Sequence, residues 1–370
     1  MDDIFYMRKV LDLAKQGTGY TSPNPLVGTV IVKNDRIIAE GYHQHYGEKH
    51  AEIMAIDNAT EPVVGGTLYC NLEPCIDGIP NKKTPPCSER IIQEKIRRLV
   101  IATTDPNPYV DGKAIALLRQ QNIQVDIGIL RDEAIQLNEK YFVFIKQNRP
   151  FIHLKIAQSL DGRIATQHGN SKWITNQNAL RRVHQWRSEY DAVLVGINTV
   201  LKDNPSLNVR MVEGRNPHRI ILDDHLQIPL DSHLVNDKES HKTVIFTSKS
   251  DKDDKARQLS KLGVKVIPIR DDEQKFMDLK QVLKQLVELK VSSLLVEGGG
   301  EIFTSFIRQK LFDKVTFFIA PMMIGTGVQS VGDLGIESLV DAVKLKNVKI
   351  EILDQQAIIE GYRDYDSIFT

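Results

Sequence analysis

The sequence predicts an α/β protein built from two domains. The chain of 370 residues is too long for one typical core, and its 41% hydrophobic content is enough to bury two. Helix-type and strand-type patterns alternate through both halves. The run Asn148-Arg149-Pro150 interrupts a helical pattern, and a new pattern begins after it. We therefore expect one domain over residues 1–147 and a second over residues 148–370.

The first domain is expected to have three layers, with helices on both faces of a sheet. Ile4, Met7, Leu11 and Ala14 recur on one face of an N-terminal helix. Two strands at 27–32 and 37–41 flank a turn at 34–35. The elements predicted after them are a helix from residue 50, a strand at 66–72, a helix through 91–96, a strand at 99–103, a helix at 114–118, a strand near 125 and a helix at 132–146.

The second domain continues the alternation. Its predicted strands cover residues 151–157, 192–195, 219–222, 243–246, 264–267 and 293–296, with helical stretches between several of them. The polar segment 248–261 is predicted to be a solvated helix face.

Composition and charge narrow the classes of function. Lys plus Arg and Asp plus Glu both total 48, so the chain lacks the net positive charge that nucleic-acid binding usually needs. No apolar run approaches the roughly 18 residues of a membrane span, and the N-terminus does not resemble a signal peptide. We expect a cytoplasmic protein that acts on a small molecule, without nucleic-acid or membrane partners.

A histidine and the cysteines of the chain form the most specific chemical pattern. All three cysteines lie between residues 70 and 87, shortly after His50 and Glu52. Catalytic zinc usually takes three protein ligands and keeps the fourth position for water. We predict His50, Cys75 and Cys87 as the zinc ligands. Glu52, two residues after the histidine on a helix, is then placed to move protons without ligating the metal, as in zinc deaminases of nucleobases.

The alternative to a catalytic metal is a structural one. Eleven residues separate Cys75 from Cys87, whereas zinc deaminases usually space these cysteines as Cys-x-x-Cys. Cys70, within the predicted strand at 66–72, could replace or complete the ligand set, although an apolar strand position favours a packed thiol. Four protein ligands would indicate structural zinc, and three would indicate a catalytic site. Cys87 is expected at a helix N-terminus, where a thiolate is stabilised.

Three glycines follow the predicted strand at 293–296. Gly298, Gly299 and Gly300 lie at a strand-to-helix turn, which can cradle phosphate groups or can simply be a tight turn. The pattern is not Gly-x-Gly-x-x-Gly and does not open its domain, so a Rossmann dinucleotide fold is not expected. Cations at Lys155, Arg187 and Arg210 could bind a phosphorylated substrate, but single cations are more often surface residues.

The chain as a whole resembles the bifunctional deaminase-reductases of riboflavin biosynthesis. The deaminase motifs appear at residues 23–28 (PNPLVG), 41–43 (GYH), 50–52 (HAE), 73–75 (EPC), 83–87 (KTPPC) and 105–108 (DPNP). The reductase motifs appear at residues 159–163 (SLDGR), 171–175 (SKWIT), 203–207 (DNPSL) and 296–300 (VEGGG). The resemblance implies a cytidine-deaminase-like domain followed by a dihydrofolate-reductase-like domain. It departs from the family in residues 76–82, where the loop is longer than usual.

The resemblance also implies residue roles. Substrate contacts in the deaminase would be made by Asn24, His43, Lys83, Asp105 and Asn107. NADPH contacts would be made by Ala157, Trp173, Thr199, Asp203, Gly298, Gly299 and Gly300. Contacts to the substrate of the reductase would be made by Lys155, Ser171, Arg187, Leu207, Arg210 and Glu297, with Lys155 assisting the reduction.

The implied function has two steps. A zinc-activated water replaces the amino group of a diaminopyrimidinone ribosyl phosphate, and NADPH then reduces the ribosyl side chain of the uracil product to ribityl. A homo-oligomer is expected. The alternatives are a deaminase of nucleosides in transfer RNA, a nucleotide-binding protein with structural zinc, and an enzyme in which only one half is active.

Overall fold

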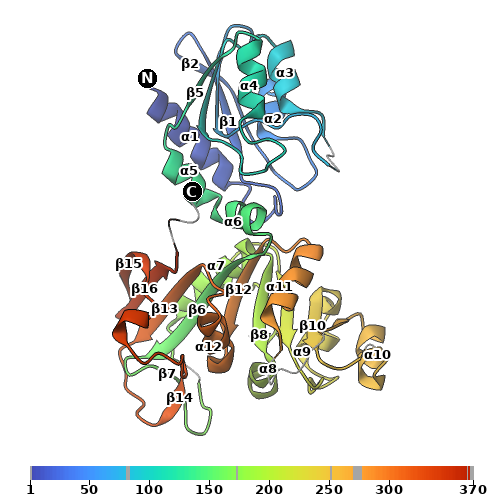
Figure 1. Cartoon of the computed structure of the whole chain (residues 1–370), viewed down its shortest axis with the longest axis vertical. Helices are drawn as coiled ribbons and strands as arrows, with labels where there is room; N and C mark the ends of the chain where they lie inside the picture. Colours follow the sequence, from blue (N-terminus) through green and yellow to red (C-terminus); the bar gives the residue numbers. More distant parts are fainter. Residues whose placement is uncertain are drawn as a thin grey trace. The chain divides into compact units, whose positions relative to one another are not determined.

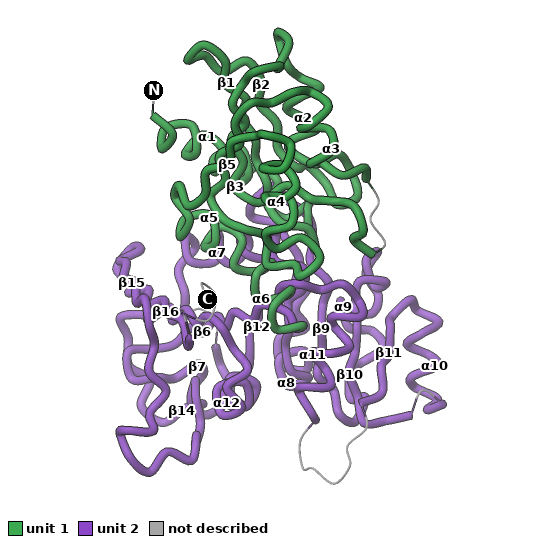
Figure 2. Tube along the Cα trace, turned by 45° about the horizontal axis from the view of Figure 1, so that its top comes forward, with its two compact units in different colours: residues 1–148, 368–370 green, residues 149–367 purple. Residues whose placement is uncertain are grey.

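A computed structural model describes residues 2–80, 84–171, 174–250, 252–269, 277–364 and 366. These residues form two compact units, one within residues 1–148 and the other within residues 149–367 (Figure 2). Within the described ranges, no helix is both long enough and apolar enough to cross a membrane.

The first unit is a sandwich of helices around a five-stranded sheet (Figure 1). The strand order is β2-β1-β3-β4-β5, in which β1 runs antiparallel to β2 and β3, while β3, β4 and β5 are parallel. The strands are β1 (Gly28–Lys33), β2 (Arg36–Tyr42), β3 (Thr67–Leu72), β4 (Arg98–Thr103) and β5 (Gln124–Ile127).

Each face of this sheet packs on its own set of helices. One core joins the sheet to α2 (Ala51–Asp57), α3 (Cys87–Gln93) and α4 (Lys113–Gln120). The other core joins it to α1 (Asp3–Lys15) and α5 (Arg131–Leu137), and α6 (Glu139–Gln147) completes the unit. The predicted three-layer arrangement of the first domain is therefore present.

Glycine allows α2 to approach the sheet closely. A Cβ atom on Gly41 of β2 would lie 2.4 Å from the backbone nitrogen of Ala55 in α2. Any larger side chain at residue 41 would push α2 away from the sheet. Because α2 begins directly after His50, this close packing helps to fix the position of the predicted metal ligand.

The second unit contains a nine-stranded mixed sheet in the order β11-β10-β9-β8-β12-β6-β13-β16-β15. The seven strands from β11 to β13 in this order are parallel, and the hairpin of β16 and β15 adds an antiparallel edge. The strands are β6 (Phe151–Ser159), β8 (Ala192–Gly196), β9 (His218–Leu222), β10 (Thr243–Thr247), β11 (Lys265–Pro268), β12 (Ser293–Gly298), β13 (Lys314–Ala320), β15 (Lys346–Leu353) and β16 (Gln356–Tyr362).

Helices cover both faces of the large sheet, and the unit also contains a small two-stranded sheet. The helices are α7 (Gln177–Glu189), α8 (Ile197–Asp203), α9 (His233–Asn236), α10 (Asp254–Lys261), α11 (Leu279–Glu288) and α12 (Gly300–Arg308), with 3₁₀ turns at Ser240–Lys242 and Leu339–Asp341. The small sheet pairs β7 (Arg163–Thr166) with β14 (Gly327–Gln329). Strand β12 returns between β8 and β6 after the chain has moved outward through β9, β10 and β11. Open α/β sheets bind ligands at the carboxyl ends of strands at such a switch point.

Two features differ from the sequence-based expectation. The helix predicted over residues 132–146 is two helices, because the buried Asn138 interrupts it and exchanges side-chain hydrogen bonds with the backbone of Leu26 (2.7 and 2.9 Å). The prediction did not include the strands β7, β13, β14, β15 and β16. The residues of β15 are nearly all exposed, although Val348, Ile350 and Ile352 alternate with polar residues in a strand-like pattern that the prediction did not use.

Candidate functional sites

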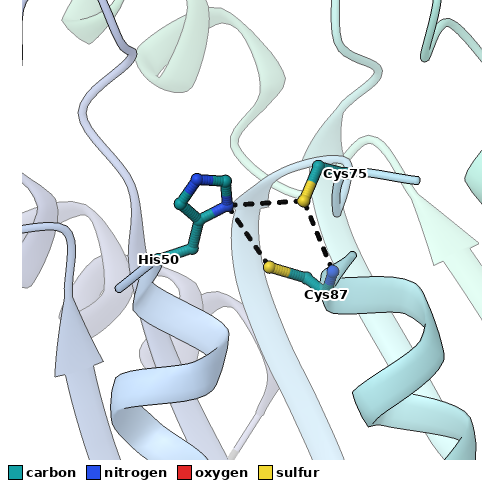
Figure 3. A group of neighbouring side chains, drawn as sticks. All are labelled: His50, Cys75 and Cys87. Carbon is teal, nitrogen blue, oxygen red and sulfur yellow. Dashed lines mark hydrogen bonds between the residues drawn. The ribbon is translucent and has the colours of Figure 1, made fainter. Parts of the chain in front are cut away.

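His50, Cys75 and Cys87 converge at one end of the first unit. His50 precedes α2, Cys75 follows β3, and Cys87 is the first residue of α3, so three separate elements bring the side chains together (Figure 3). The Nδ1 atom of His50 lies 3.4 Å from the Sγ of Cys75 and 3.3 Å from the Sγ of Cys87. The three potential ligand atoms all lie within 4.8 Å of one another.

The donor set fits zinc. One imidazole and two thiols are ligands that zinc prefers, and Cys87 lies at a helix N-terminus as expected. Among the described residues, these three form the only group of histidine, cysteine and acidic side chains close enough together to hold a metal. Cys70 lies in the hydrophobic core of the unit, where burial raises the pKa of its thiol. The described residues therefore supply three candidate ligands, so that a tetrahedral zinc ion would have one position for an external ligand.

Glu52 lies in the first turn of α2, beside this group. Its side chain is only 3% exposed, and its Oε2 atom is buried without a hydrogen-bond partner among the described residues. Burial raises the pKa of the carboxyl group, and a contact with the Cys87 thiol opposes that effect. A buried carboxylate oxygen without a partner is costly, so this atom is suited to bind a water or substrate group at the site.

Two polar side chains, Asn24 and His43, lie near His50. Asn24 Nδ2 lies 3.1 Å from His43 Nε2, and His43 Nδ1 lies 3.0 Å from the carbonyl oxygen of Lys49. Burial lowers the pKa of His43, whose ring lies 5.4 Å from that of His50. The structure therefore brings together Asn24, His43 and His50, which the sequence placed on three separate segments.

Asp105 and Asn107 lie on the segment that follows β4. The carboxylate of Asp105 accepts hydrogen bonds from the Tyr141 hydroxyl and from the backbone N–H of Asn107, each at 2.9 Å. Burial raises the pKa of Asp105 to about 7, and the nearby charges of Glu73 and Cys75 also contribute to the increase. Lys83, the remaining predicted contact of this site, lies outside the described residues.

Thr84 is a neighbour of the predicted metal site that sequence reasoning missed. Its Oγ1 atom lies 3.3 Å from Nε2 of His50, on the opposite side of the ring from the cysteines. Histidine ligands usually use their second nitrogen in a hydrogen bond that fixes the ring orientation. The position of Thr84 within the motif at 83–87 was the available signal, but the motif does not reveal which side chain it contacts.

The second unit has a cavity at the carboxyl ends of β8, β9 and β12. Its volume is about 390 Å³, and its lining includes Ser171, Thr199, Asp203, Gly299 and Gly300. The structure thus gathers five residues that the resemblance assigned to cofactor or substrate. These residues lie at the switch point of the sheet, where a ligand is expected.

The glycine turn between β12 and α12 depends on its residue type. Gly298 has φ of +154°, which other residues rarely adopt, and a Cβ atom on Gly300 would lie 2.4 Å from the carbonyl oxygen of Gln329. Thr199 of α8 faces the turn, with its Oγ1 3.7 Å from the position of a Cβ atom on Gly298. Because residues 298–300 have no side chains, their backbone groups can approach a ligand in the cavity closely.

Arg187 and Glu297 form a buried ion pair. The guanidinium donates through Nε and Nη2 to the two carboxylate oxygens at 2.6 and 2.7 Å. The side chains are 12% and 7% exposed. Burial alone would raise the pKa of Glu297, but the pairing with Arg187 holds that pKa below its ordinary value. Burial lowers the pKa of Lys155, and the charge of Glu297 partly offsets this effect, so the three groups are electrostatically coupled.

The remaining predicted residues of the second unit lie in different surroundings. Arg210 lines another cavity, of about 710 Å³, together with residues 174–177 and 320–322. The side chain of Leu207 is 3% exposed within a hydrophobic core, so a ligand contact there would involve its backbone. Ala157 on β6 packs against a core that includes Val183 and Phe318. Trp173 lies outside the described residues.

Comparison with known proteins gives a consistent result over both units. Residues 1–103 match the family model for the cytidine and deoxycytidylate deaminase zinc-binding region, and residues 150–359 match the RibD C-terminal domain. The riboflavin biosynthesis protein RibD of Aquifex aeolicus is 45% identical over 355 residues, which cover 96% of each chain. The chain belongs to the RibD family.

Other RibD proteins agree with this assignment. RibD of Escherichia coli is 34% identical, over 94% of this chain and 95% of its own. Among solved structures, a diaminohydroxyphosphoribosylaminopyrimidine deaminase/5-amino-6-(5-phosphoribosylamino)uracil reductase from Thermotoga maritima is 36% identical, with a TM-score of 0.85 over 97% of this chain and 98% of that one. RibD of Acinetobacter baumannii is 33% identical, with a TM-score of 0.87 over the same shares.

The RibD assignment confirms the family resemblance and the predicted fold class. The first unit is the cytidine-deaminase-like domain, and the second is the reductase domain. The chain is therefore a bifunctional deaminase and reductase of riboflavin biosynthesis.

Proposed function

We propose that the first unit hydrolytically deaminates 2,5-diamino-6-(5-phosphoribosylamino)pyrimidin-4(3H)-one and that the second reduces the ribosyl side chain of the resulting uracil with NADPH. The observation that supports this most directly is the convergence of His50, Cys75 and Cys87 beside Glu52, whose buried Oε2 has no hydrogen-bond partner among the described residues. Three ligands with an adjacent proton carrier favour catalytic over structural zinc.

His50, Cys75 and Cys87 would hold the zinc ion. When bound, zinc supplies a water with a pKa of about 7, which is a far better nucleophile near neutral pH than free water. Glu52 takes a proton from the attacking water and delivers one to the departing amino group, because its carboxylate faces the site from the first turn of α2.

The surrounding polar side chains would orient the pyrimidine and its ribosyl phosphate. Asn24 and His43 form one polar pair, Asp105 and Asn107 form a second, and Lys83 adds a cation suited to phosphate. Since the substrate is a free nucleotide, the enzyme has no need to extract a base from a duplex. The absence of net charge on the chain is compatible with such a substrate.

In the second unit, the cavity at the switch point would hold the nicotinamide cofactor. We assign its contacts to Thr199, Asp203 and the glycine turn 298–300, together with Ala157 and Trp173. When bound, NADPH supplies the hydride that reduces C1 of the ribosyl group. The protein orients the two reactants and controls the charge around them.

The side chains at the substrate end of the reductase would bind polar groups of the ribosyl phosphate. Two hydrogen bonds fix the relative orientation of Arg187 and Glu297. The charges of both groups affect the pKa of Lys155. Lys155 would assist the reduction as a proton donor, because burial lowers the pKa of its ammonium group and so makes proton release easier. Ser171, Leu207 and Arg210 complete the proposed substrate contacts.

The edge of the large sheet supports a homo-oligomer. Val348, Ile350 and Ile352 alternate along β15, so they share one face of that strand, and they are 48%, 70% and 69% exposed. An apolar edge strand is a common site of association. We infer that a second copy of the chain covers this face.

Mass spectrometry of the purified protein with the diaminopyrimidinone ribosyl phosphate tests both activities. Without cofactor, the substrate should gain about one mass unit as an amino group becomes an oxo group, and with NADPH the product should gain about two more. An unchanged substrate in both tubes, with zinc bound, would contradict the proposal and favour a nucleic-acid substrate or structural zinc. A single mass change would show that only one half is active.

A further inference from the structure

Glu73 is a buried carboxylate that the mechanism above does not use. It directly follows β3, lies two residues before Cys75, and is only 3% exposed. Such a group requires strong hydrogen-bonding compensation within the fold.

Four backbone N–H groups provide that compensation. Oε1 accepts from Ala114 at 3.0 Å and Ile115 at 3.2 Å, while Oε2 accepts from Gly112 at 2.9 Å and Asp105 at 3.3 Å. Three of these donors belong to the first turn of α4 or the residue that precedes it. Glu73 therefore caps a helix that is distant in sequence, where the helix dipole also favours its negative charge.

The two ends of one segment meet at this carboxylate. Strands β3 and β4 run side by side, with Leu72 opposite Thr103, and the backbone N–H of Glu73 donates to the carbonyl of Thr103 at 3.0 Å. The chain leaves β4, passes through residues 105–111 and enters α4 at residue 113. Glu73 accepts from this segment at its start, from Asp105, and at its end, from Gly112, Ala114 and Ile115.

The segment carries two of the proposed substrate contacts. Asp105 accepts from the N–H of Asn107 at 2.9 Å, and Asn107 Oδ1 accepts from the N–H of Tyr109 at 3.0 Å. These short-range bonds set the local shape of the segment, but they do not attach it to the metal ligands. Glu73 makes that attachment, because the chain continues from it through Pro74 to Cys75.

We propose that Glu73 is a positioning residue that fixes the distance between the substrate-binding segment 105–115 and the zinc ligand Cys75. The inference rests on the proposed function of Asp105 and Asn107 as deaminase substrate contacts. An anchor between the two affects substrate binding without touching the substrate, because a misplaced contact binds the substrate more weakly while the metal site keeps its geometry.

Glu73→Gln tests this role with little change in size. An amide has one acceptor oxygen where the carboxylate has two, so its NH₂ group must face two of the four N–H donors. We expect the KM for the deaminase substrate to rise about tenfold or more, with kcat changed about threefold at most, because a binding contact is misplaced while the metal site is retained. Zinc content and the reductase activity on supplied uracil intermediate should equal those of the unmodified protein.

Hydrogen exchange of the zinc-loaded protein supplies a readout that needs no substrate. In Glu73→Gln, the amides of residues 105, 112, 114 and 115 should exchange faster, while those of β1 and α2 should not change. Glu89→Gln is the matched control, since Glu89 is an exposed glutamate on the adjacent α3 and should leave KM and exchange unaltered.

Three results would overturn the inference: a KM within twofold of that of the unmodified protein, unchanged exchange in residues 105–115, or loss of zinc together with the change in KM. If the unmodified protein binds zinc but does not deaminate the substrate, the proposed function fails, and the exchange experiment still decides whether Glu73 anchors the segment. If Glu73→Gln does not fold, Glu73→Asp provides the second test. Its shorter carboxylate should raise KM with zinc retained, and an unaltered KM would refute the role.

Discussion

The buried pair of Arg187 and Glu297 allows a quantitative test of the reductase site. Glu297→Gln removes the negative charge and one of the two acceptors that the guanidinium uses at 2.6 and 2.7 Å. The side chain of Arg187 is 12% exposed, so solvent cannot replace the lost partner fully. Removing one partner of a buried ion pair costs about 3–5 kcal/mol, and because glutamine keeps one hydrogen bond we expect a loss of about 3 kcal/mol.

The chain offers a specific optical probe for this measurement. Its two tryptophans, Trp173 and Trp186, both belong to the second domain, so their fluorescence follows the unfolding of that domain alone. Trp186 packs against His153 and Phe318, with ring centroids 4.8 and 5.6 Å away, and should respond strongly to loss of packing. With a urea slope of about 3 kcal/mol/M, a loss of about 3 kcal/mol moves the midpoint down by about 1 M.

A matched pair on the same helix provides the control. Arg182 of α7 makes a two-bonded ion pair with Glu351, at 2.7 and 2.9 Å, but the side chains are 31% and 52% exposed. Exposed pairs contribute about 0–1 kcal/mol, so Glu351→Gln should move the midpoint by less than about 0.3 M. If Glu297→Gln costs no more than Glu351→Gln, burial does not determine the strength of the pair, and the reasoning is wrong.

The double substitution Arg187→Met with Glu297→Met separates the contribution of the ion pair to stability from its contribution to reductase activity. Replacing a buried pair by apolar side chains of similar volume is often close to neutral, so the double variant should be more stable than Glu297→Gln. It should nevertheless lose reductase activity, because both groups are proposed substrate contacts. Retained activity would exclude them from the site.

Three further predictions concern the other proposals. Glu52→Gln should keep zinc and reductase activity but lower kcat for deamination by about 10²–10⁴-fold, which is the usual range for a lost general acid-base group; loss of both activities in the folded protein would contradict two independent sites. Since burial raises the pKa of Asp105 to about 7, its carboxylate acceptor is lost as the pH falls through that value. Titration calorimetry should therefore show the uracil product binding more weakly below pH 7 than above it, and the same pH dependence in Asp105→Asn would refute this assignment. Light scattering should give a mass that is a multiple of 41.9 kDa for the unmodified protein and 41.9 kDa for Ile350→Asp, whereas an unmodified monomer would rule out the proposed association through β15.

The sequence was most informative where function depends on residue type at short spacing. His50 and Glu52 share one helix start, and Cys87 begins another, so helical geometry and zinc chemistry together predicted how they would be used. Short, mainly apolar runs likewise predicted β8, β9, β10 and β12, because a strand that is covered by helices on both faces is apolar along most of its length. The sequence-based prediction missed the edge strand β15, whose residues are nearly all exposed, although Val348, Ile350 and Ile352 alternate with polar residues along it.

The local sequence pattern around a polar side chain does not predict a hydrogen-bond partner that is distant in sequence. Nothing near Glu73 predicts that it caps a helix beginning forty residues later, because the pairing follows from the adjacency of β3 and β4. Arg187 and Glu297 meet across 110 positions for the same kind of reason, since α7 and the end of β12 come together only in the folded sheet. The sequence by itself determined which chemistry the chain could perform. The tertiary structure decided which groups hold one another in place, because a buried charge is stable only beside partners that the fold brings to it.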